Sequence, residues 1–233
     1  MNARTWERWA GIAGLVFFAT LLGTFFLPST PELSIADSEL GPAIAADARG
    51  LGADVYLLGL GGAAFGIFAS GIASRIRAAE GERAASSIGV LVGAVVFVSM
   101  TLVAAGVSLA LVAAAREGRD EAAVRALFEL DNVLFVPAGF ALAVFLLSTA
   151  AGVVSTRALP TWLGWAAAAL GVGFVVSSLG VLSADDEGGP LGFAFFIDLM
   201  LSMLWVLAAA VALLREPRRA AAPVTRRVAT PSV

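Results

Sequence analysis

The sequence predicts an all-α fold, a polytopic membrane bundle of six transmembrane helices with both termini in the cytoplasm. Of the 233 residues, 59% are hydrophobic and 14% are charged, against about 25% charged in soluble proteins. Six apolar runs approach or exceed the roughly 20 residues that a helix needs to cross a bilayer. The arginines gather in alternate connections between these runs. We expect residues 1–214 to form one transmembrane domain.

The first three predicted spans cover residues 9–27, 55–74 and 88–113. The first run is longer than the apolar core of a typical signal peptide, so we expect this span to be retained. The third exceeds what a hydrocarbon core of roughly 30 Å requires and should tilt or extend beyond the lipid. Gly62, Gly66 and Ser70 recur every four residues in the second span. Such a small-residue stripe lets another helix pack closely, either within the bundle or in a dimer.

Two connections between spans, residues 28–53 and 116–132, carry helix signals of their own. In the first, Thr30 and Pro31 are expected to begin a short surface helix that Gly41 ends. In the second, three apolar residues share one face of a helix whose other face is charged: Val124, Leu127 and Phe128. This pattern predicts an amphipathic helix that lies along the membrane surface.

The last three predicted spans cover residues 133–154, 162–183 and 191–214. Asp131 and Asn132 are expected to cap the first of these helices, and Pro137 lies near its start, where proline costs little. Residues 215–233 are rich in Arg, Ala and Pro without apolar periodicity, which predicts a disordered, basic cytoplasmic tail. Its five arginines either attract anionic lipid of the inner leaflet or serve only to anchor the topology.

Charge distribution predicts the orientation. With six spans, one side of the membrane holds eleven arginines: Arg4, Arg8, Arg75, Arg77, Arg83, Arg157, Arg215, Arg218, Arg219, Arg226 and Arg227. The other side holds four: Arg49, Arg116, Arg119 and Arg125. Because cytoplasmic loops carry the excess of basic residues, the side with eleven arginines and both termini is predicted to be cytoplasmic.

Tryptophans open two of the spans at this predicted cytoplasmic interface. Trp6 and Trp9 begin the first span, and Trp162 and Trp165 begin the fifth. Indole rings prefer the boundary between lipid and water, so we interpret these four residues as interface anchors. Both pairs follow a threonine with the same spacing, which indicates either an internal repeat or two helices anchored by the same preference.

Residues 159–165 read Leu-Pro-Thr-Trp-Leu-Gly-Trp. This stretch resembles a Leu-Pro-x-Trp-Leu-Gly-Trp signature common in small bacterial membrane proteins with about six spans, many of which carry only a domain of unknown function. The resemblance covers at most the fourth to sixth spans. It implies a multi-pass protein of the bacterial cell membrane, and it implies no activity and no catalytic residue.

Asp198 is the only ionisable side chain well inside an apolar run. A charged Asp at a helix centre costs about 2.5 to 3.5 kcal/mol, so this shallower one should face the bundle interior. Several hydroxyl groups are expected at similar depth or on the same helix face: Thr20, Ser108, Ser177, Ser178 and Ser202. We predict a polar layer of these hydroxyls around Asp198. Alternatively, the hydroxyls bond to carbonyls of their own helices and Asp198 is a neutral structural donor.

The residue types that the chain lacks exclude several kinds of site. It contains no His, Cys or Lys, which excludes His-ligated zinc and haem, iron-sulfur clusters, thiol redox pairs and a Schiff base to retinal. We expect no metal, cofactor or nucleic-acid partner. The lipid bilayer is the partner that the composition implies, whereas a protein partner or a second copy stays open.

Three classes of function are compatible with these features. The first is a structural or accessory bundle that binds lipid or a partner protein. The alternative is a small proton- or cation-linked transporter or channel that uses Asp198. In it, acidic residues of the outer loops attract cations: Asp54, Asp131, Asp185, Asp186 and Glu187. An enzyme is not expected, because an intramembrane aspartyl protease needs two facing Asp residues.

Overall fold

The computed structural model describes residues 3–28, 30–31, 34–81, 84–182 and 189–215. The fold of this part is all-α, as predicted. Its helices are α1 (Ala3–Thr24), α2 (Asp37–Ala46), α3 (Ala48–Glu80), α4 (Ala85–Arg116), α5 (Glu121–Val133), α6 (Phe135–Thr156), α7 (Thr161–Ser177), the 3-10 helix η1 (Ser178–Leu182) and α8 (Pro190–Arg215). From residue 216 onward the predicted tail lies outside the described residues.

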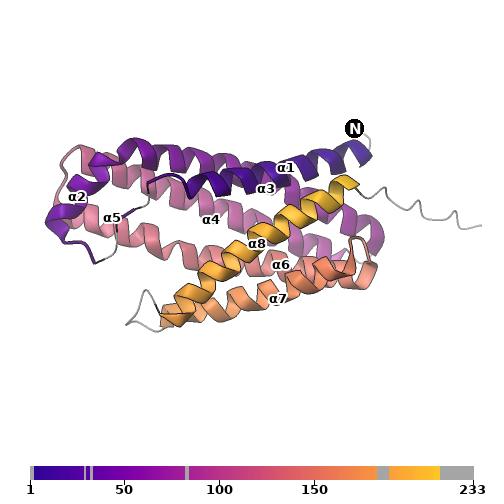
Figure 1. Cartoon of the computed structure of the whole chain (residues 1–233). Coiled ribbons are helices and arrows are strands. Elements are labelled where there is room, and N and C mark those ends of the chain that lie inside the picture. The colour runs from indigo at the N-terminus through magenta and orange to yellow at the C-terminus, as the bar shows by residue number, and fades with distance from the viewer. Residues whose placement is uncertain (1–2, 29, 32–33, 82–83, 183–188, 216–233) are drawn as a thin grey trace, which may run out of the picture.

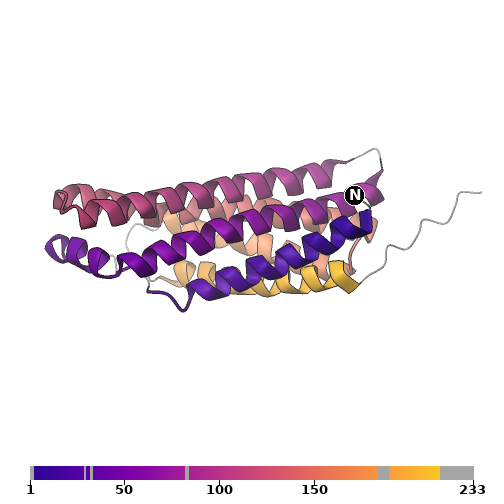
Figure 2. The same cartoon turned by 90° about the horizontal axis from the view of Figure 1, so that it is seen from above.

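The long helices form a closed ring. α1 packs on α3, α3 on α4, α4 on α6, α6 on α7 and α7 on α8, and α8 returns to α1. Figures 1 and 2 show that α1 begins and α8 ends at the same end of the bundle, whereas α2 and α5 lie at the opposite end. α8 crosses the bundle obliquely (Figure 1). The ring therefore encloses an interior to which all six long helices contribute.

In the described part of the chain, five helical stretches are long and apolar enough to cross a membrane: 48–80, 85–116, 121–156, 161–180 and 190–215. α1 is less apolar, because its 22 residues include Arg4, Glu7 and Arg8. Large apolar side chains cover the outside of the bundle. On α4, Val92 and Val95 are 52% and 63% exposed. Lipid accommodates such a surface, whereas water does not.

The helices differ from the predicted spans mainly at their ends. α3 and α4, with 33 and 32 residues, are each about 50 Å long, so both exceed a bilayer core of roughly 30 Å. The predicted cap of the fourth span is wrong: Asp131 lies inside α5, and Leu134 joins α5 to α6. The fifth span loses its α-helical geometry early, because α7 ends at Ser177 and the chain tightens into η1.

At the end of the bundle away from the chain start, α2 and α5 pack on the ends of α3 and α4. They bury a hydrophobic cluster apart from the core of the bundle, here called the second cluster: Leu40, Ile44, Ala48, Leu51, Leu111, Val112, Val124 and Phe128. The predicted apolar face of α5 is correct, but it packs on protein. α5 leads directly into α6 (Figure 1), and its orientation along the membrane surface stays a prediction.

The helix in the first outer connection starts later than predicted. α2 begins at Asp37 and continues through Gly41 and Pro42. Asp37 and Glu39 place negative charge in its first turn, which favours a start there. Burial of Leu40 and Ile44 in the second cluster stabilises the helix on both sides of the proline, so tertiary packing outweighs the local stop signal.

α1 and α3 approach closely at positions that advance together along both helices. A Cβ added at the glycines of this contact would lie within 3 Å of the other helix, in the pairs Thr20 with Gly61, Gly14 with Phe68, and Ala10 with Gly71. One turn further, the same register brings Glu7 opposite Arg75. Both side chains are buried, 5% and 6% exposed, so each of the two helices buries one charged residue near this end. The sequence interpretation placed Arg75 in a cytoplasmic loop and missed this burial.

The Leu-Pro-Thr-Trp-Leu-Gly-Trp stretch forms the turn between α6 and α7. Leu159 and Leu163 are buried, and the Leu163 carbonyl accepts a 2.9 Å hydrogen bond from the Trp205 indole of α8. A Cβ added at Gly164 would lie 2.9 Å from Val154 Cγ2 of α6. The stretch therefore closes a tight hairpin and ties it to the last helix.

Candidate ligand cavity

A cavity of about 450 Å³ lies inside the ring of helices. α1, α3, α4, α6, α7 and α8 all contribute to its wall, together with the segment after α1 and the end of α5. Ligand pockets in proteins commonly have about 300 to 1,000 Å³, so this space is large enough for a small molecule.

The body of the cavity is apolar and aromatic. Phe65 of α3 is its centre, with ring centroids 5.0 Å from Phe17, 4.9 Å from Phe97 and 5.0 Å from Phe145. All four line the cavity, and Phe65 and Phe145 are fully buried. Four different helices thus supply one rigid aromatic wall, which suits an apolar ligand.

The hydroxyl groups that line this apolar part already donate their protons. Each bonds to a carbonyl of its own helix: Thr20 to Phe17, Thr24 to Leu21, Thr101 to Phe97 and Ser202 to Leu199, at 2.8 to 2.9 Å. Such bonds satisfy the donor and leave oxygen lone pairs able to accept a hydrogen bond.

Two carboxyl groups form the polar end of the cavity. Asp54 comes from α3 and Asp131 from α5, and both line the cavity. Asp131 is buried, and its Oδ1 accepts a 2.6 Å hydrogen bond from Ser108 Oγ of α4. Asn132 lines the same end and donates its side-chain amide to the Phe128 carbonyl at 2.9 Å.

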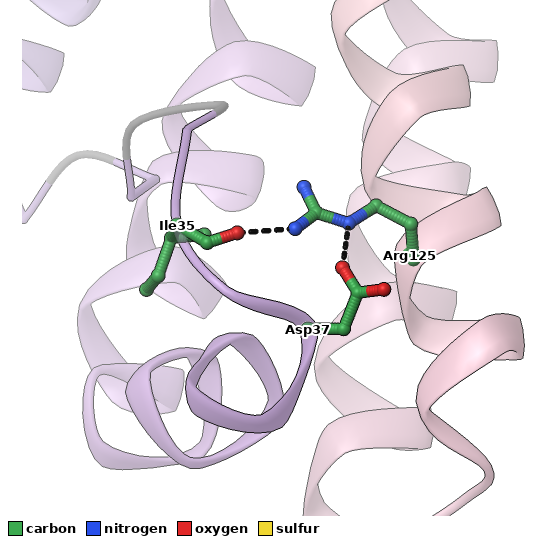
Figure 3. Close-up of polar contacts among 3 residues, drawn as sticks. All are labelled: Ile35, Asp37 and Arg125. Atoms are coloured by element: carbon green, nitrogen blue, oxygen red, sulfur yellow. Dashed lines mark hydrogen bonds and ion pairs between the residues drawn. The ribbon is translucent and has the colours of Figure 1, made fainter.

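Arg125 holds the helix that carries Asp131. Figure 3 shows its guanidinium between two groups of the α2 region: Nε lies 2.6 Å from Asp37 Oδ1, and another nitrogen donates to the Ile35 carbonyl. The same guanidinium lies 5.7 Å from the centre of the Phe128 ring. These contacts join α5 to α2 and so fix where Asp131 enters the cavity.

Asp198 lies at the contact between α7 and α8. Its Oδ2 accepts a 3.1 Å hydrogen bond from Ser177 Oγ. A Cβ at Gly173 would lie 2.5 Å from Asp198 Oδ1, so the glycine lets the carboxyl group approach α7. The structure brings Asp198 and Ser177 together, as the predicted polar layer requires, and Asp198 is not among the lining residues of the cavity.

The other hydroxyls of the predicted layer lie elsewhere. Thr20 and Ser202 line the cavity and bond within their own helices, as the alternative interpretation expected. Ser108 bonds to Asp131. Ser178 Oγ is buried beside Gly139 and has no hydrogen-bond partner among the described residues.

The predicted small-residue stripe of α3 meets few neighbouring atoms. A Cβ at Gly62 would make ordinary contact with Val98 at 3.7 Å, one at Gly66 would meet nothing within 4 Å, and Ser70 bonds to the carbonyl of Ile67.

The four tryptophans lie near the starts of two helices: Trp6 and Trp9 in α1, and Trp162 and Trp165 in α7. All except Trp6, which is partly buried, are exposed.

Sequence reasoning treated Asp54 and Asp131 only as acidic residues near the outer surface. A signal was present, because residues 54, 58, 61 and 65 follow helical spacing and all line the cavity. Comparison with protein-family models, with curated proteins and with solved structures finds no match for this chain. The function is therefore inferred from the geometry of the cavity.

Proposed function

We propose that this chain is a six-span helix bundle of the bacterial plasma membrane, with both termini in the cytoplasm, that binds an apolar, chain-like molecule inside the bundle. This is the lipid-binding form of an accessory membrane protein. The observation that carries the proposal is the aromatic cavity of about 450 Å³ lined by helices from the whole chain. Transport through Asp198 is less favoured, because that carboxyl group lies outside the cavity lining.

Two features support a sixth span by α1. It packs along α3 and α8 and so completes the ring, and Ile12 and Val16 are exposed on its outer side, as a lipid-facing helix requires.

The described arginines divide between the two ends of the bundle. Arg77 and Arg157 lie where the chain starts, while Arg116 and Arg119 lie at the other end.

The orientation can be tested directly, because the chain has no native cysteine. We expect Asp120→Cys, in the exposed turn between α4 and α5, to react with a membrane-impermeant maleimide in intact spheroplasts. Arg77→Cys, exposed at the opposite end, is expected to react only after lysis. Labelling of both in intact spheroplasts, or only of Arg77→Cys, would contradict the proposed topology.

Filling the cavity tests the binding function. Ala104 is buried on α4 and lines the cavity, so Ala104→Phe is expected to weaken binding of dodecanol by about tenfold or more by occupying its site. The thermal midpoint of the ligand-free protein should not fall, because the new phenyl ring occupies space that the cavity already provides. Native mass spectrometry of protein released from a glycol-ether detergent measures the bound alcohol.

The matched control is Ala113→Phe, on an exposed position of the same helix outside the cavity lining. It should bind dodecanol as the unmodified chain does. Equal binding by the Ala104→Phe and unmodified proteins would show that the alcohol sits elsewhere, and the proposed function would fail.

A further inference from the structure

We infer that the ligand is a single-chain amphiphile with a cationic head, its positive charge held between Asp54 and Asp131 and its chain in the aromatic part of the cavity. The inference rests on the proposed binding function and adds the chemical class of the ligand. Asp54 and Asp131, which have no role in binding the apolar chain, would recognise the head group of the ligand.

The charges around the cavity all have one sign. Among the described residues that line it, Asp54 and Asp131 are acidic and none is arginine, and the chain has no Lys or His. Arg125, the cation that positions α5, is engaged with Asp37 and Ile35. Apolar walls keep the local dielectric low, so two acidic groups with no basic lining residue beside them favour a cationic ligand over an anionic one.

The hydrogen-bonding capacity of the cavity points the same way. The lining hydroxyls of Thr20, Thr24, Thr101 and Ser202 donate to backbone carbonyls, and Ser108 donates to Asp131. What they and the carboxylates offer a ligand is acceptors. An anionic head would therefore meet repulsion with few donors to offset it, whereas an ammonium head would find complementary groups.

One of the two carboxyl groups, that of Asp131, is held in place before any ligand enters. Ser108 fixes Asp131 from α4, and Asp54 extends from a separate helix, α3. A cation placed between two carboxyl groups favours the charged form of both, which burial alone disfavours. Acidic groups that are partly buried beside each other occur most often at functional sites.

A bare metal ion fits less well than an amphiphile. No group of three or more Asp or Glu side chains able to hold a metal ion occurs in the described part of the chain. An ion would also leave the aromatic wall around Phe65 without a role. An ammonium group joined to an alkyl chain uses both the acidic end and the apolar body of the same cavity.

The test compares three probes that have the same chain and different heads: dodecyltrimethylammonium, dodecanol and dodecyl sulfate. The full-length protein in a glycol-ether detergent is titrated with each, and native mass spectrometry gives the fraction carrying one probe. We expect the cation to bind about tenfold more tightly than the alcohol, and the sulfate to bind most weakly.

The Asp54→Asn/Asp131→Asn double variant keeps side-chain size and removes both charges. It is expected to bind the cation and the alcohol within about threefold of each other while its alcohol affinity stays unchanged. Asp54→Asn alone keeps the bond between Ser108 and Asp131, and it should lose part of the preference even where the double variant folds poorly. Asp198→Asn is the matched control, since this acid lies outside the cavity lining, and it should keep the full preference.

The outcomes separate the two proposals. Equal binding of the cation and the sulfate, or a preference that survives removal of both carboxylates, overturns the cationic head and leaves the binding function standing. Failure of all three probes to bind at the cavity, with no effect of Ala104→Phe, overturns the binding function itself.

Discussion

Arg75→Met is expected to lower the free energy of unfolding by about 3 to 5 kcal/mol, because Arg75 is a buried charge and the register of α1 on α3 puts a second buried charge, Glu7, on the facing helix. The register of α1 on α3, set by Ala10 against Gly71, places the two side chains one turn beyond the closest approach of the helices. Methionine fills much of the volume of arginine, so the decrease in the free energy of unfolding would result from the missing charge and not from a new cavity. Equilibrium unfolding in mixed micelles with increasing dodecyl sulfate measures it.

Arg77→Met is the matched control, two residues further along the same helix and exposed. It should change stability by less than about 0.5 kcal/mol. Adding Glu7→Gln to Arg75→Met is expected to recover a large part of the loss, because the buried charge is then gone. Equal, small effects of Arg75→Met and Arg77→Met would show that the two buried charges do not stabilise each other.

The helices themselves could be predicted because each apolar run must satisfy its backbone within one segment. α4 and α8 contain the runs 88–113 and 191–214 and extend them by only a few residues. Their ends were less predictable. Pro42 lies inside α2 because burial of Leu40 and Ile44 outweighs a local signal, and α5 packs on α2 for the same reason.

The cavity could not be predicted, because it depends on which helices are neighbours. Asp198 drew attention as the one acid inside an apolar run, whereas Asp54 and Asp131 stand at the borders of runs, where charge is ordinary. Closure of the ring brings these two together from positions 77 residues apart in the chain. Arg75 was misjudged for the same reason, since its burial requires α1 to cross at Gly71.

Gly93→Ala is expected to cost about 3 kcal/mol, as an overpacked contact between α4 and α6. The new Cβ would lie 2.4 Å from the backbone nitrogen and 2.7 Å from the Cα of Phe145, and 3.0 Å from the Ala141 carbonyl. All three are backbone atoms, which cannot turn aside as a flexible side chain can, so the two helices must separate. The same unfolding measurement detects the loss.

Gly66→Ala provides the comparison within a helix that the sequence singled out for close packing. Nothing lies within 4 Å of its added Cβ, so the substitution should be neutral or stabilise by up to about 1 kcal/mol through the lower flexibility of alanine. Phe145 forms part of the aromatic wall, so Gly93→Ala should also weaken dodecanol binding while Gly66→Ala does not. A larger loss at Gly66 than at Gly93 would mean that the helices approach along the small-residue stripe, and the ring that encloses the cavity would then be wrong.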